Sequence, residues 1–281
     1  MAVKAKNENT ATDGAGIQFA DEATTKAFNL QPHIIGMLLE EPFYGKILRI
    51  LSKTRTNAIR TAGVLCKDGD LKLWYNASFM AALGGKHVRG VMKHECLHLV
   101  LEHTTTRKFE PHIIWNYATD LAINSHLDGE LPDFCLMPGV PFKELTAEDK
   151  ERMGDEAVKR YELVSAKVAS FPKGQAAEWY FARLMEDKDV ADAIEDPNPG
   201  QPGGEGGEPG EGGEPGEGDG PGMPGTLDDH SGWGEGMSDE DKEFVKAKIK
   251  QAASDAAKDC DSKGSWGSVP AELRKQIKAA L

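Results

Sequence analysis

A stretch rich in glycine, proline and glutamate over residues 195–225 limits what this chain can fold into. The hexapeptide GEGGEP occurs there twice, at 204–209 and 210–215. Glycine raises the entropy cost of ordering a backbone, proline removes hydrogen-bond donors, and the glutamates repel one another. We therefore expect a disordered acidic tether over residues 191–226, and we expect one folded domain over residues 21–190.

The negative charge of the chain is concentrated in and around this tether. The formal net charge is −13, and sixteen acidic residues lie between Asp189 and Asp241 without any Lys or Arg, so the remainder carries +3. The sequence has no basic patch that would favour nucleic-acid binding, and the acidic run would repel a phosphate backbone. The sequence contains no run of 18 apolar residues, the length that a membrane-spanning helix needs. We expect neither nucleic acid nor membrane as a partner.

The N-terminus and the cysteines are those expected of a cytoplasmic protein. Residues 1–20 are small and polar, so we expect them to be disordered, and they lack the apolar segment of a secretory signal. The four cysteines are spread from Cys66 to Cys260 without a CxxC pair, which favours reduced thiols.

Signals for helix and strand alternate along residues 21–190, which predicts the α+β class, mostly helical with a small β-sheet. The apolar spacing from about Asp21 to Leu51 predicts two helices separated at Pro42. Two β-prone runs, 61–66 and 71–75, flank an Asp-Gly turn and predict a hairpin. Further helices are expected at about 86–102, 111–128, 147–170, 175–186 and 239–258, with a loop at 132–141 and a short tail after the last helix.

The sequence HECLH at residues 94–98 forms an HExxH pattern inside the helix expected at 86–102. Positions i and i+4 share a helix face, so the imidazoles of His94 and His98 can reach one zinc ion at about 2.0–2.1 Å. Glu95 lies about 100° further round, where it can hold and deprotonate a water on the metal. The alternative is a surface helix with hydrogen-bonded histidines. The strongly apolar flanks favour a buried helix instead.

A catalytic zinc site needs a third protein ligand and one open position. Glu102 would lie about 6 Å further along the helix axis than His98, and His103 would lie about 140° off the ligand face. We therefore expect the third ligand on another segment. The candidates elsewhere are His112, Asp120, His126 and His230.

The best of these donors is Asp120, in the helix expected to begin near Pro111. Asn116, Asp120 and Asn124 are spaced i, i+4 and i+8, and they form a polar stripe on an otherwise apolar helix. Packed against the HExxH helix, the stripe would offer one carboxylate to the metal and two amides to support the ligands. The alternative interpretation of the stripe is an exposed polar face or a helix-capping network.

A second polar motif, DDHSGW at residues 228–233, follows the tether. One interpretation is a turn or helix cap, with Trp233 anchoring the tail on the core. In the other, the segment folds back and His230 lines the metal cleft as a catalytic residue, donating a hydrogen bond to the oxyanion of the reaction. We expect residues 227–281 to dock on the core.

Four stretches taken together point to a known family: LWYNASF at 73–79, HECLHLVLEH at 94–103, WNYATDLAIN at 115–124 and DDHSGW at 228–233. They resemble the predicted metallopeptidase domain that often precedes a von Willebrand A-like domain in bacterial and phage proteins. The resemblance covers about residues 30–235. About 48 residues follow the last motif, too few for a von Willebrand A-like domain, so a partner bound through that domain is not implied.

The resemblance implies a zincin-like fold and a location in the cytosol of a bacterium or of a phage-infected host cell. It implies one Zn²⁺ per chain, with His94 and His98 as ligands, Asp120 as the third ligand and Glu95 as general base.

We expect hydrolysis of peptide bonds in a protein or peptide substrate. One alternative is a non-catalytic, metal-stabilised protein-binding module, and another is a zinc hydrolase of a non-peptide amide. An intact Glu95 favours an enzyme, because a structural metal site needs no base. A site closed by a fourth protein ligand would favour the binding module. The sequence identifies no particular partner protein.

Overall fold

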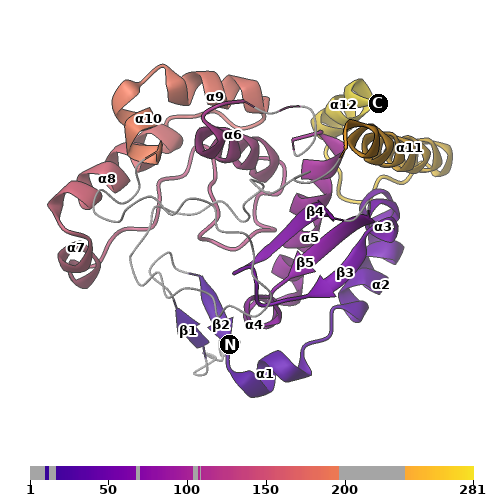
Figure 1. The fold of residues 1–281 in the computed structure, drawn as a ribbon, viewed down its shortest axis with the longest axis horizontal. Coiled ribbons are helices and arrows are strands. Elements are labelled where there is room, and N and C mark those ends of the chain that lie inside the picture. Colours follow the sequence, from indigo (N-terminus) through magenta and orange to yellow (C-terminus); the bar gives the residue numbers. More distant parts are fainter. Residues whose placement is uncertain (1–9, 13–16, 68–69, 104–106, 108, 196–237) are drawn as a thin grey trace.

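A computed structural model describes residues 10–12, 17–67, 70–103, 107, 109–195 and 238–281 of the 281-residue chain. Over these residues the protein is mostly helical with a small β-sheet (Figure 1), which confirms the α+β class predicted from the sequence. None of the helices in the described ranges is long and apolar enough to cross a membrane.

The main sheet has three strands in the order β3-β5-β4. Strands β4 (Ala62–Lys67) and β5 (Asp70–Tyr75) pair antiparallel, as the predicted hairpin requires, with Val64 opposite Leu73. Strand β3 (Ser52–Arg55) pairs parallel with the other edge of β5. It was not predicted, because its sequence SKTR has no alternation of apolar and polar residues.

Three short helices precede the sheet: α1 (Glu22–Ala27), α2 (Gln31–Glu40) and α3 (Pro42–Arg49). The predicted break at Pro42 is confirmed, because this proline opens α3, where the missing N–H would have no helical partner. The segment before Pro42 forms two helices, because the chain leaves the helical conformation between α1 and α2. Phe28 has extended backbone, and the Asn29 side chain accepts a hydrogen bond from the N–H of Gln31.

The expectation of disorder over residues 1–20 is wrong in part. Strands β1 (Thr10–Thr12) and β2 (Gln18–Ala20) pair antiparallel. The hydroxyl of Ser78, in helix α4 (Ala77–Ala82), donates a hydrogen bond to the carbonyl of Ala20 at 2.9 Å, and Ile17 is buried. These contacts with the core order a segment whose own composition is polar. Residues 1–9 and 13–16 lie outside the described part of the chain.

The helices that follow α4 are α5 (Gly85–Val100), α6 (His112–Asn124), α7 (Ala147–Met153), α8 (Asp155–Ala169), α9 (Ala177–Met185), α10 (Lys188–Glu195), α11 (Asp239–Lys263) and α12 (Ala271–Ala280). The described residues bury two apolar clusters. The first surrounds the sheet and includes residues of α2, α3, α5, α11 and α12. The second is formed mainly by α6, α8, α9 and α10.

Two expected boundaries differ from the structure. The helix predicted over 147–170 is divided at Gly154, which has φ +77°. The tether was expected to begin at residue 191, but α10 continues to Glu195 because Val190 and Ile194 are buried in the second cluster. The rest of the predicted tether, and the motif at 228–233 with His230, lie outside the described residues.

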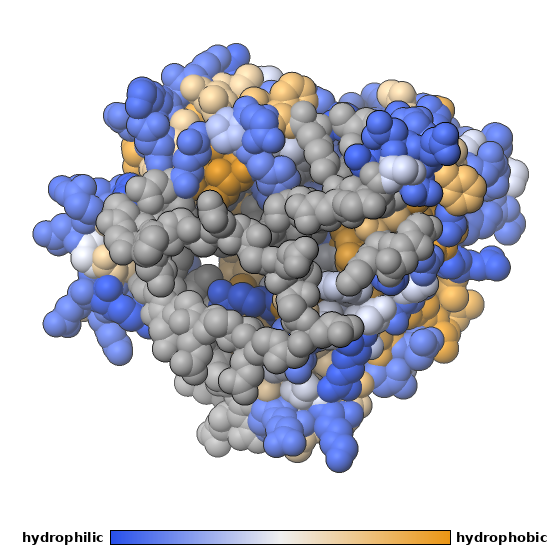
Figure 2. Space-filling view, viewed as in Figure 1, coloured by the Kyte–Doolittle hydropathy of each residue, from blue (hydrophilic) through white to orange (hydrophobic). Residues whose placement is uncertain are grey.

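Helices α11 and α12 lie on the first cluster, with α11 packed on α3 (Figure 1). Trp266, in the loop between the two helices, stacks on Phe43 of α3 with 5.3 Å between ring centroids. Helix α12 replaces the short tail that was expected, with Leu273 and Ile277 buried. Figure 2 shows hydrophilic side chains over the outer turns of α7, α8, α11 and α12.

A buried lysine ties these segments to α5. The ammonium of Lys93, whose side chain is 3% exposed, pairs with the carboxylates of Glu41 at 2.7 Å and Glu130 at 2.6 Å. It also donates to the hydroxyl of Ser268 at 2.7 Å, between α11 and α12. Lys93 immediately precedes the HECLH motif, so this network holds the C-terminal segment, the α2–α3 junction and the motif helix in one arrangement.

Candidate metal centre

Helices α5 and α6, one from each cluster, carry the candidate metal centre. His94 and His98 lie on α5, and Asp120 lies on α6. One ligand atom from each of the three side chains lies within 4.8 Å of the others. The two histidines are 0% exposed and Asp120 is 1% exposed. The structure therefore brings together the three residues that were predicted as metal ligands, in a group that could bind a metal ion.

The distances within this group suit a tetrahedral ion. His94 Nε2 lies 2.9 Å from His98 Nε2. Asp120 Oδ1 lies 3.3 Å from His98 Nε2 and 3.7 Å from His94 Nε2. Ligand atoms about 2.0–2.1 Å from a tetrahedral zinc ion are separated from one another by about 3.3 Å. The three separations lie around this value, so the triangle fits three corners of a tetrahedron.

Asn124 fixes the tautomer of His94. The amide nitrogen of Asn124 donates a hydrogen bond to the carbonyl of Leu136 at 2.8 Å. Its oxygen therefore faces His94 Nδ1, at 2.8 Å, and accepts the proton that this nitrogen carries. The lone pair of His94 is left on Nε2, which faces Asp120.

The donor chemistry of the group calls for a cation. Two imidazole nitrogens and a carboxylate oxygen converge where almost no surface reaches solvent. Electron-rich atoms repel one another at these separations, and a buried carboxylate is costly unless a positive charge compensates it. A metal ion among the three atoms supplies that charge, so the residues fit a metal.

Glu95 follows His94 in the sequence and is 0% exposed. A carboxylate inside the protein at this point of α5 is unusual unless the site uses it. Burial, and then the charge of Glu95, raise the pKa of the Cys96 thiol well above its ordinary value. Cys96 is therefore a neutral thiol, and it is not a member of the group formed by His94, His98 and Asp120. All four cysteines of the chain are buried.

The end of α5 brings a further histidine to the centre. Glu102 has φ +59°, in the left-handed region. The N–H of His103 donates to the carbonyl of His98 at 3.0 Å, and the N–H of Glu102 donates to that of Leu99 at 3.1 Å. These two bonds define a Schellman motif. The chain turns back, and the ring of His103 lies on that of His98 with 5.5 Å between centroids.

The expected position of His103, about 140° from the ligand face, is therefore wrong, because the helix does not continue to residue 103. His103 lies outside the group of His94, His98 and Asp120, but its ring packs on that of His98 and on that of Trp115 of α6, with 6.0 Å between the His103 and Trp115 centroids. Sequence reasoning missed this turn because its usual signal, a glycine, is absent and Glu102 takes the left-handed position.

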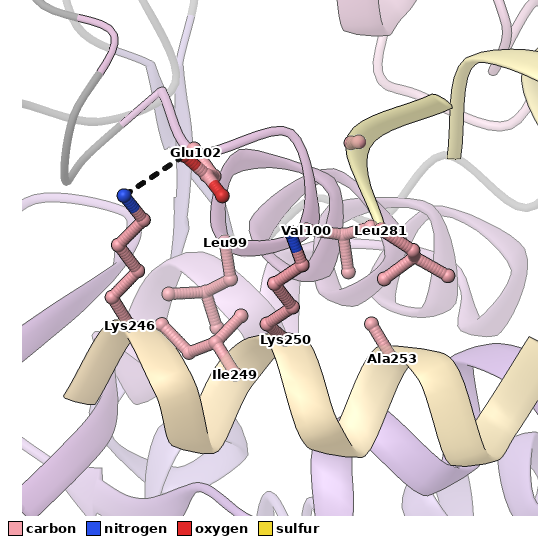
Figure 3. Close-up of a pocket in the computed structure, with 9 residues that line it drawn as sticks. Leu99, Val100, Glu102, Lys246, Ile249, Lys250, Ala253 and Leu281 are labelled. Carbon is pink, nitrogen blue, oxygen red and sulfur yellow. Dashed lines mark ion pairs between the residues drawn. The ribbon is translucent and has the colours of Figure 1, made fainter. Parts of the chain in front are cut away.

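The remaining candidates lie elsewhere. His112 opens α6, and His126 follows α6 beside Gln276 of α12. Glu102 extends toward α11, where its carboxylate pairs with Lys246 at 4.0 Å (Figure 3). Of the six side chains considered for the third ligand, Asp120 is the one that joins both motif histidines, while His230 lies outside the described residues.

Comparison with known proteins places the chain in a family. No curated protein and no solved structure matches it. A family model described as "Putative metallopeptidase domain" matches residues 25–279. The matched range includes both helices of the candidate centre, the whole of α11, and α12 up to its last residue but one. The chain therefore belongs to this metallopeptidase-domain family, which its sequence motifs had indicated.

Proposed function

We propose that this protein is a zinc-dependent peptidase that hydrolyses peptide bonds in a protein or peptide substrate. His94, His98 and Asp120 would hold the ion, and Glu95 would act as general base. The observation that carries the proposal is the buried triangle of His94 Nε2, His98 Nε2 and Asp120 Oδ1, in a chain of a metallopeptidase-domain family.

Zinc is the ion that best suits this donor set. Two imidazoles and one carboxylate, with a fourth position left open, are typical of catalytic zinc sites. When bound, zinc lowers the pKa of a coordinated water toward about 7 and polarises a carbonyl oxygen.

The protein's own side chains would do the remaining work. Asn124 keeps His94 in the tautomer that turns its Nε2 lone pair toward the ion. Glu95 would take a proton from the attacking water and pass it to the leaving amine of the substrate. Because Glu95 is fully buried, its proton exchanges with bulk solvent less readily than that of a surface carboxylate.

Each of the two alternatives differs from the proposed peptidase in one respect. The binding module differs in having a closed metal site, and the non-peptide hydrolase differs in its substrate. A non-catalytic binding module would be favoured by a fourth protein ligand. Within the described residues, the group of histidine, cysteine and carboxylate side chains has three members, so none of these side chain types takes a fourth position at the proposed ion. A hydrolase of a non-peptide amide would use the same groups and would differ only in the bond that it cleaves.

The test compares the wild-type protein with Glu95→Gln, which keeps the shape of the side chain and removes the base. Both full-length proteins are loaded with zinc and incubated with peptides from a digested proteome, and new termini are detected by mass spectrometry. We expect new termini with wild type. We expect one zinc per chain but no new termini with Glu95→Gln.

A matched control is Glu151→Gln, because Glu151 is exposed on α7 and distant in sequence from the motif. This variant should cleave as wild type does. Equal cleavage by Glu95→Gln would refute the role of the base. Absence of cleavage by wild type, with zinc bound, would favour the binding module or the non-peptide amide.

A further inference from the structure

A cavity of about 390 Å³ lies where the end of α5 meets α6, α9 and α12. Leu101 and His103 line it from the end of α5, and Ala122 lines it from α6. Ala177 lines it from the first turn of α9, and Ala279 lines it from α12. Ligand pockets usually have volumes of about 300–1,000 Å³, so this cavity has room for a large side chain and part of its backbone.

His103 connects the cavity to the metal centre. Its ring lines the cavity and also packs on the ring of His98. One side chain therefore separates the cavity from the ligand group. A residue of extended peptide spans about 3.3–3.6 Å, so a neighbour of a bond held at the ion could place its side chain in this cavity.

The lining of the cavity is mainly apolar. Leu101 and five alanines contribute to it. Arg107, the positively charged lining residue in the described part of the chain, is already paired: its guanidinium donates to Glu178 at 2.8 Å and to the carbonyl of Leu101 at 3.0 Å. Gln276 interacts with His126 through its side chain. These polar groups have partners of their own within the protein.

The carboxylate of Glu102, which also lines the cavity, pairs with Lys246 on α11 (Figure 3). The charges at the cavity wall are thus compensated by neighbouring residues. An apolar side chain entering the cavity gains free energy by leaving water, whereas a charged one would lose its hydration without meeting an uncompensated opposite charge.

We propose that this cavity is a specificity subsite that receives a large apolar side chain of a peptide, such as Leu, Met or Phe, next to the bond that is cleaved. The proposal rests on the proposed peptidase function and names the substrate class of the same site. Helix α12 forms one wall of the subsite, so the C-terminal helix takes part in substrate selection as well as in packing.

Binding to the zinc-loaded Glu95→Gln variant tests the subsite without catalysis. The probes are two pentapeptides, acetyl-Gly-Gly-Phe-Gly-Gly-amide and acetyl-Gly-Gly-Ala-Gly-Gly-amide, measured by calorimetry. We expect the phenylalanine peptide to bind about 10-fold more tightly or better, because its ring buries much more apolar area than a methyl group does. Equal affinities would overturn the proposal.

A bulky residue in the wall supplies the structural control. Ala279 is exposed at the cavity, so Ala279→Trp in the Glu95→Gln background should fill it without disturbing the core and should abolish the preference for phenylalanine. The matched variant is Ala271→Trp, at the exposed first residue of the same helix, and it should keep the preference. A preference that survives Ala279→Trp would place the phenylalanine elsewhere and overturn the assignment.

Cleavage by the wild type separates this inference from the proposed function. In one outcome, the cleaved peptides show large apolar residues enriched at one fixed position beside the cleaved bond. If Ala279→Trp loses this enrichment, the result supports both the peptidase function and the subsite. Cleavage without such enrichment leaves the peptidase standing and removes the subsite. A preference in binding without any cleavage by wild type supports the apolar peptide cavity and refutes the peptidase.

Discussion

Asn124 joins His94 to the backbone of the loop after α6: its oxygen lies 2.8 Å from His94 Nδ1, and its nitrogen donates to the carbonyl of Leu136 at 2.8 Å. Since a carbonyl can only accept, the amide has one orientation, and the imidazole has one tautomer. The candidate metal centre therefore depends on a chain of contacts that reaches beyond its three ligands.

Asn124→Leu should weaken zinc binding by about 10–100-fold, the usual cost of losing a hydrogen-bond partner of a metal ligand. Competition with a chromophoric chelator measures the affinity. Ser125→Ala is the control, because the Ser125 hydroxyl donates to the carbonyl of Ala122 and does not contact the ligands. Zinc affinity in Asn124→Leu equal to that of Ser125→Ala would show that the amide does not support His94.

Gly90→Ala should destabilise the protein, although alanine normally stabilises a helix. A Cβ at Gly90 would collide with the carbonyl oxygen of Glu130, so α5 would have to shift. We expect a loss of about 1–3 kcal/mol in the free energy of unfolding, measured with chemical denaturant. At Gly36 in α2, by contrast, a Cβ would meet Arg89 at 3.5 Å, an ordinary contact.

Gly36→Ala should therefore stabilise the protein by about 0.5–1 kcal/mol, since alanine costs less backbone entropy in a helix. The two substitutions are chemically identical and should change stability in opposite directions. If both stabilise the protein, then α5 does not approach the loop at Glu130 as closely as described.

Lys93→Met should destabilise the fold by about 3 kcal/mol, because it removes the cation between two carboxylates and leaves their charges uncompensated. The side chains of Glu41 and Glu130 are only 13% and 24% exposed, so water compensates them incompletely. Denaturant titration measures the loss. Adding Glu41→Gln and Glu130→Gln should recover most of it.

The control for the lysine is Lys188→Met. Lys188 pairs with Asp192 on the surface of α10, with both side chains largely exposed. Water screens the charges of an exposed pair, so this variant should be close to wild type in stability. A similar small effect for Lys93→Met would mean that the buried network does not hold the C-terminal segment in place.

His126 should make the fold less stable as the pH falls. Burial lowers the pKa of this histidine below its ordinary value of 6.5, although Gln276 and Glu272 oppose the shift. Below about pH 6.5 the unfolded chain takes up a proton that the folded chain resists, so folding loses free energy there. His126→Asn does not titrate, so its stability relative to wild type should rise between pH 7 and pH 5.

Thermal unfolding across this pH range measures the difference, in which contributions from the other histidines cancel. A difference that stays constant from pH 7 to pH 5 would contradict the burial of His126 against α12.

The parts of the fold and centre that follow short-range periodicity could be predicted from the sequence. The spacing of His94 and His98 places both on one face of a helix, and the stripe of Asn116, Asp120 and Asn124 does the same on the next helix. Asn124 holds His94 as this pattern suggested. The role of Asn116 remains a prediction.

The features that depend on distant contacts or on unusual backbone could not be predicted. Strand β3 exists because it pairs with β5, and its own residues carry no signal. Helix α10 continues past the expected boundary because Val190 and Ile194 find a core to pack against. The approach of His103 to His98 requires a left-handed glutamate at position 102, which no sequence pattern indicates.

Anomalous diffraction from zinc-loaded crystals, measured on both sides of the zinc absorption edge, tests the central claim most directly. We predict one zinc peak per chain, about 2.0–2.2 Å from His94 Nε2, His98 Nε2 and an oxygen of Asp120. A chain that retains no zinc, or a peak bonded to other side chains in place of these three, would contradict the account.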